Sequence, residues 1–137
     1  MCEKECFLIL IGHRFIDSQT LYHVNNIDAI IKTPPSSTLY IIFSETNLEL
    51  ITHASENGIH FAIKVQDITE LIYASSLKAK YIIVSKELAK TAQEIAENYL
   101  FDSKILVQIQ EDAEIEETAL LNIDGAIYAN AIIKISS

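Results

Sequence analysis

The chain has 137 residues, half of them hydrophobic, and carries a formal net charge of −9 at pH 7. This size and composition exclude a disordered chain and predict one folded domain that spans residues 1–137. The acidic surface repels phosphate backbones and anionic lipids, so we expect neither a nucleic-acid partner nor a membrane partner.

The N-terminal segment predicts neither export nor a metal centre. The apolar run from Cys6 to Ile11 is too short for the hydrophobic core of a signal peptide or for a membrane span. Cys2 and Cys6 provide no disulfide framework, and no second ligand pair completes a zinc site. We therefore expect a cytoplasmic protein that uses no metal and no cofactor.

Strand and helix patterns alternate along the rest of the chain. Apolar runs predict strands at residues 6–11, 38–43, 60–65, 80–84, 104–109 and 125–128, with a further short strand at 22–24. Helical periodicity predicts helices at 27–31, from 48 to the stop at Asn57-Gly58, at 68–75, at 86–99 and at 111–121. The predicted N-caps include Asn26, Asp67 and Ser85. In the helix after Ser85, the predicted buried stripe consists of Leu88, Ala92, Ile95 and Tyr99.

A short internal repeat supports the same architecture. Glu-Leu-Ile occurs at residues 49–51 and again at 70–72, each time in a helix that precedes an apolar strand. This is the size of one βα unit with a right-handed crossover to a parallel strand. Because about six strands are too few for an eight-stranded barrel, we expect an α/β fold with a mainly parallel, open three-layer sheet of the flavodoxin-like kind. A half-barrel that pairs in a dimer is the alternative.

Ligands of parallel α/β folds bind at the carboxyl ends of the strands, which selects a set of candidate residues. His13 and Arg14 follow the first buried strand and are the best candidates for holding an anion. A surface or structural role is the alternative for each candidate, because polar side chains near helix starts also cap helices. The candidate ligand-binding residues are His13, Arg14, Lys64, Lys86, Gln110 and Asn130.

Lys64 is the candidate with the most distinctive position. Strand alternation places Lys64 on the same face as His60 and Ala62, opposite Phe61 and Ile63. An inward-facing lysine near the end of a barrel strand has the setting of a Schiff-base lysine, whose pKa is lowered by burial. The alternative is an edge strand with one solvated face, where a lysine discourages edge-to-edge pairing.

The glycine content excludes several nucleotide-binding classes. Gly12, Gly58 and Gly125 are the only glycines, and they are far apart in the sequence. A dinucleotide-binding fingerprint or a P-loop needs clustered glycines so that backbone N–H groups can approach phosphate. No complete catalytic set of residues is recognisable either, so whether the protein is an enzyme stays open, with a non-enzyme favoured.

The last third of the chain combines a strand at Leu106–Gln108, a helix, and the strand Ile123-Asp124-Gly125-Ala126-Ile127-Tyr128, which runs on into Ala131–Lys134. This pattern resembles the closing units of phosphate-binding (β/α) barrels such as keto-deoxy-phosphogluconate aldolase and indole-glycerol-phosphate synthase. The resemblance implies a barrel-related fold and a phosphate site near the last strands. Gln108–Gln110 and Ala129–Asn130 replace the phosphate-binding glycines of that group, so side chains would have to hold a ligand here.

These observations favour a non-catalytic module that binds a small anionic or carbonyl ligand or another protein, and that forms a homo-oligomer. The alternative is a lyase or isomerase that acts on a small carbonyl or phosphorylated compound. In that case Lys64 would be the nucleophile, and His13 and Arg14 would hold the anion. A structural subunit of a larger complex is a third interpretation.

Overall fold

The structure is a computed structural model that describes residues 8–135. Within this range eight parallel strands form one sheet, in the spatial order β1-β7-β6-β5-β4-β3-β2-β8. The strands are β1 (Ile9–Ile11), β2 (Leu21–His23), β3 (Thr38–Ile42), β4 (Phe61–Lys64), β5 (Tyr81–Val84), β6 (Lys104–Ile109), β7 (Gly125–Tyr128) and β8 (Ile132–Lys134). Cys2, Cys6 and the start of the first predicted strand lie outside the described residues.

Helices connect most of these strands. The α-helices are α1 (Ile27–Ile30), α2 (Leu48–Glu56), α3 (Ile68–Ser76), α4 (Lys86–Asn98) and α5 (Ala113–Leu120), and two 3-10 turns are η1 (Glu45–Asn47) and η2 (Ala129–Ala131). The predicted caps hold in part: the side chains of Asn26 and Asp67 accept backbone N–H bonds at their helix starts, whereas that of Ser85 makes no such bond. No helix within residues 8–135 is both long and apolar enough to cross a membrane.

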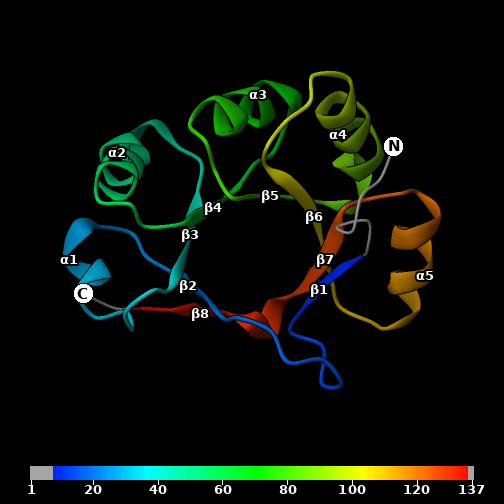
Figure 1. Ribbon diagram of the computed structural model, residues 1–137, viewed down its shortest axis with the longest axis horizontal. Coiled ribbons are helices and arrows are strands. Elements are labelled where there is room, and N and C mark those ends of the chain that lie inside the picture. The colour runs from blue at the N-terminus through cyan, green and yellow to red at the C-terminus, as the bar shows by residue number, and fades with distance from the viewer. Residues whose placement is uncertain (1–7, 136–137) are drawn as a thin grey trace.

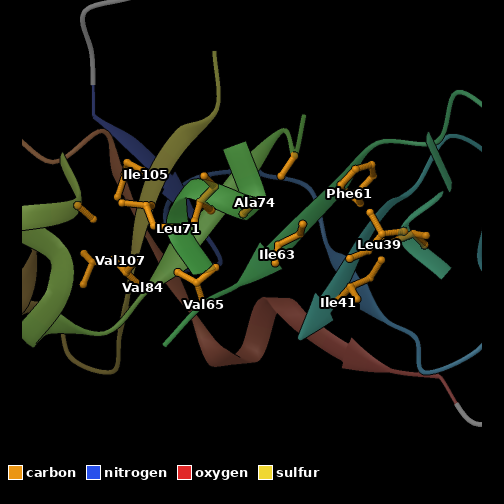
Figure 2. Close-up of a cluster of buried hydrophobic side chains, with 14 of the residues drawn as sticks. Leu39, Ile41, Phe61, Ile63, Val65, Leu71, Ala74, Val84, Ile105 and Val107 are labelled. Atoms are coloured by element: carbon orange, nitrogen blue, oxygen red, sulfur yellow. The ribbon is translucent and has the colours of Figure 1, made fainter. Parts of the chain in front are cut away.

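The sheet curls around its own axis, and the helices lie outside it (Figure 1). One hydrophobic cluster fills the space between the sheet and the helices, and Figure 2 shows it around Ile63, Leu71 and Val107. A second cluster lies on the opposite, inner face of the strands and contains no α-helical residue. Its buried members are Ile11, Leu21, Tyr40, Ala62, Tyr81, Ile83, Leu106, Ile127 and Ala131.

The prediction of an open three-layer sheet with about six strands is therefore wrong, although the α/β class and the parallel pairing are confirmed. The sheet curls instead of staying open because the helices cover only one of its two faces (Figure 1). The other face is apolar as well, and curling lets the strands cover it with one another. The sequence analysis missed β8, because η2 redirects the chain from β7 into a new strand within three residues.

Four helices end in the same way. After each of α2, α3, α4 and α5, one residue has a backbone in the left-handed conformation. This residue ends the helix in a Schellman-type motif. The next residue donates its N–H to a carbonyl five positions back, which connects the helix directly to the following strand. The four bonds run from Ile59 to Ala54, from Ala79 to Ala74, from Phe101 to Ala96 and from Ile123 to Thr118.

Helix α4 is rotated relative to the prediction. Its buried residues are Ala89, Ala92, Gln93 and Ala96, whereas Tyr99 of the predicted stripe is 73% exposed. Small alanine side chains let the helix approach β6 closely. The amide oxygen of Gln93 accepts a hydrogen bond from the N–H of Asp124, which accounts for a buried glutamine in this face.

The Asp124-Gly125 pair joins three strands at the amino end of β7. The Asp124 carboxylate accepts the N–H of Ile105 at 2.9 Å, and its carbonyl oxygen accepts the N–H of Ile9 at 3.0 Å. A Cβ on Gly125 would lie 2.5 Å from the carbonyl oxygen of Ile9. The pair that resembled a phosphate-barrel motif thus lets β1 and β6 pack against β7.

Candidate functional site

The six candidate residues all lie at the carboxyl end of the curled sheet. His13 and Arg14 follow β1, Lys64 ends β4, and Lys86 opens α4 directly after β5. Gln110 follows β6, and Asn130 lies in η2 after β7. The hydrogen bonds divide these residues into separate groups rather than one constellation.

The first group contains His13 and Arg14 and is centred on Asp112, which lies at the start of α5. Arg14 Nη1 lies 2.9 Å from Asp112 Oδ2, and His13 Nε2 lies 3.3 Å from Asp112 Oδ1. The Tyr128 hydroxyl at the end of β7 also donates to Asp112 Oδ1. His13 Nδ1 accepts the N–H of Phe15, so this hydrogen-bond pattern assigns the imidazole proton to Nε2, facing Asp112.

The electrostatics of this group follow from its hydrogen bonds. Donation from Tyr128 and Arg14 holds the pKa of Asp112 below its ordinary value. Removal from water, and then the hydrogen bond to Asp112, raise the pKa of Tyr128 to about 12. The anion that His13 and Arg14 face is a carboxylate of this chain. An external anion would therefore compete with Asp112 for the buried His13 and for Nη1 of Arg14.

The second group contains Lys86 and Gln110 and is centred on Glu114 in the first turn of α5. Lys86 Nζ lies 2.8 Å from Glu114 Oε1, while Glu114 Oε2 accepts the N–H groups of Gln110 and Glu111. The lysine and these two backbone bonds lower the pKa of Glu114 to about 2. The arrangement fastens the start of α5 to α4, so the charge of Lys86 is already paired within the chain.

Asn130 makes a local backbone contact. Its side-chain amide donates to the carbonyl oxygen of Gly12 at 3.2 Å. Gly12 has a φ of 96°, and a Cβ there would lie 2.9 Å from the Cβ of Ala131. Asn130 therefore joins η2 to the end of β1, where the two edges of the curled sheet approach each other.

Lys64 is in a different situation. It shares the inner face of β4 with Ala62, as predicted, and is partly buried; its Nζ lies 3.5 Å from Gln108 Oε1 on β6. Burial lowers the pKa of Lys64. No carboxylate within residues 8–135 lies within ion-pair distance of its amine. The edge-strand interpretation of Lys64 is wrong, because β4 lies between β3 and β5.

Sequence reasoning missed Asp112, Tyr128 and Glu114 as members of these groups, whereas it placed Gln108 at the carboxyl end of its strand. Asp112 and Glu114 belong to an acidic run, and acidic residues are common in the first turn of any helix. The run therefore gave no sign of a specific role. Asp112 is 98 positions from Arg14 in the chain, so only the fold brings the two together. The available signal was their place directly after a strand, which is where the candidate residues were sought.

The described residues contain no group of three or more His, Cys, Asp or Glu side chains that could hold a metal ion. A scan of protein-family models finds no match to this chain, and a search of the curated proteins finds none either. Functional inference therefore rests on the geometry of the site.

Proposed function

We propose that this chain is a non-catalytic, cytoplasmic α/β domain that binds a small anionic or carbonyl ligand at the carboxyl end of its curled sheet. The observation that carries the proposal is Lys64, a partly buried cation on the inner face without a carboxylate partner in the described residues. A charge in a partly dehydrated site interacts more strongly with a ligand than a charge in open water.

We propose a non-catalytic domain because the carboxylates near the candidate site are paired with basic side chains of the same chain. Asp112 pairs with His13 and Arg14, and Glu114 pairs with Lys86. The lowered pKa values of Asp112 and Glu114 keep both carboxylates ionised near neutral pH, so neither is a good proton donor to a substrate. Homo-oligomer formation stays a prediction.

A thermal-shift screen with inorganic phosphate, sugar phosphates and keto acids tests ligand binding. A ligand at one hundred times its Kd stabilises the folded state by about 2.7 kcal/mol and raises Tm accordingly. We expect Lys64→Gln to abolish the shift. Lys104→Gln, which removes the same charge from an exposed residue at the amino end of the sheet, should retain it. A flat screen would contradict ligand binding and favour a protein-interaction module instead.

A second function is a lyase or isomerase that uses Lys64 as a nucleophile. The lowered pKa of Lys64 favours it, because an amine must be neutral to attack a carbonyl. The amine would add to the carbonyl and lose water to form an imine, which borohydride reduces to a stable secondary amine. Mass spectrometry after borohydride treatment with small aldehydes or keto acids would locate such an adduct. An adduct at Lys64 together with turnover would replace the non-catalytic proposal.

A further inference from the structure

A second pair of basic side chains lies on the inner face of the sheet, at the carboxyl end. Leu21 and Ile132 are register partners on β2 and β8 and belong to, or pack against, the inner hydrophobic cluster. Two residues further along, His23 and Lys134 are register partners as well. Because side chains alternate along a strand, His23 and Lys134 lie on that same inner face.

The environment of this pair lacks a counter-charge. Lys134 is exposed, and no carboxylate within residues 8–135 lies within ion-pair distance of its amine. Burial and then repulsion from Lys134 lower the pKa of His23. His23 Nε2 is buried and has no hydrogen-bond partner in the described part of the chain. A buried imidazole nitrogen without a partner costs free energy unless a ligand or a water satisfies it.

Lys64 lies at the same carboxyl end of the curled sheet, which we call its mouth. Strands β3 and β2 separate β4 from β8, and the curl of the sheet turns their inner faces toward a common axis (Figure 1). Ile42 is the register partner of Lys64 on β3 and is 40% exposed on this face. The mouth thus offers basic groups on β4, β2 and β8, with an apolar side chain on the strand between them.

We propose that Lys134 forms a second anchor opposite Lys64, so that the site takes a small anion with at least two negative charges. This inference rests on the proposed function and adds the charge class of its ligand. Lys64 holds one negative group and Lys134 the other. Ile42 contacts the carbon skeleton of the ligand. In a chain of net charge −9, two lysines at one end of the sheet, both without a carboxylate partner within residues 8–135, attract an anion.

Isothermal titration with succinate, inorganic phosphate and acetate at constant ionic strength tests the second anchor. We expect the wild type to bind succinate or phosphate more tightly than acetate. Losing one charge-assisted hydrogen bond weakens binding roughly tenfold to a hundredfold. Lys64→Gln and Lys134→Gln should each show this loss, Lys134→Arg should retain most of the affinity, and Lys104→Gln should bind like the wild type.

The outcomes separate the two proposals. If Lys134→Gln binds the dianions like the wild type while Lys64→Gln does not, the second anchor is wrong and ligand binding at Lys64 stands. Acetate binding as tightly as succinate and phosphate also overturns the second anchor. If none of these anions binds the wild type, the second anchor fails. The proposed function then fails only if the wider screen with sugar phosphates and keto acids is flat as well.

Discussion

At the residue scale, Gly125 marks a close approach between strands β7 and β1. A Cβ at this position would meet the carbonyl oxygen of Ile9 at 2.5 Å and its Cβ at 2.6 Å. Neither backbone can move without disturbing β7 or β1. The glycine of the Asp-Gly pair therefore serves strand packing, at the end of the sheet opposite the candidate site.

We expect Gly125→Ala to lower the free energy of unfolding by about 3 kcal/mol, the upper range for overpacking a core. Gly58→Ala is the matched control, because a Cβ at that position would have no atom within 4 Å and only the φ of 67° is unfavourable. That control should lose about 1 kcal/mol. Urea denaturation monitored by circular dichroism measures both. Equal losses would show that Gly125 does not mark a steric limit.

Leu100 shows a different residue-scale feature, backbone strain at a helix end. It has a φ of 55° and a side chain that is 85% exposed, so it adopts a glycine conformation without gaining burial. We expect Leu100→Gly to stabilise the fold by about 0.5–1 kcal/mol. The matched control is Leu120→Gly, which removes a similarly exposed leucine from the last position of α5 and should cost up to about 1 kcal/mol. Thermal unfolding checks the opposite signs.

At the element scale, Glu114 connects the start of α5 to α4 and to the loop after β6. Its carboxylate holds Lys86 and the N–H groups of Gln110 and Glu111. The pKa is about 2 in the folded protein and 4.5 in the reference state. Because the folded pKa is depressed, the stabilisation is present above pH 4.5 and is lost as the pH falls toward 2.

We expect Glu114→Gln to be less stable than the wild type at pH 6, with the difference shrinking at pH 3. Glu116→Gln, an exposed carboxylate in the same helix, is the control and should change stability little at either pH. Urea unfolding at the two pH values measures this. A constant difference between Glu114→Gln and the wild type would mean that charge at Glu114 does not stabilise α5.

The elements also show where local sequence signals suffice. The bounds of β6 and β7 match the prediction, because both strands are mostly apolar and are bordered by polar residues or turns. Asn26 and Asp67 cap helices as predicted, since capping depends on neighbouring residues alone. The buried face of α4 was predicted in part: Ala92 is buried and Leu88 and Ile95 pack against the core, whereas Tyr99 is exposed. The exact side that a helix turns inward depends on the sheet beneath it.

At the scale of the whole molecule, the curled sheet has two edges, β1 and β8. Each of these strands pairs with one neighbour only, whereas β5 lies in the middle of the sheet and all four of its residues are buried. Local opening is easiest where few contacts and one ladder of hydrogen bonds hold a strand. Gly12 and Asn130 add a contact between the end of β1 and η2.

We expect amide hydrogen exchange to be slowest in β5 and clearly faster in β8. Gly12→Ala places a Cβ 2.9 Å from that of Ala131 and should speed exchange in β1 and β8 while leaving β5 unchanged. Exchange followed by mass spectrometry resolves these segments. Uniform protection across β5 and β8, or a Gly12→Ala effect spread evenly over the sheet, would contradict this description of the edges.

The sequence by itself determined the βα repeat, the parallel pairing, the central strands and the face that Lys64 shares with Ala62, because each follows from periodicity or from contacts between near neighbours. Only the tertiary structure decided the curl of the sheet, strand β8, and the pairing of Asp112 with His13 and Arg14. These features join segments far apart in the chain. The way in which both faces of the sheet bury their apolar side chains decides which of these segments come into contact. That burial is a property of the whole fold.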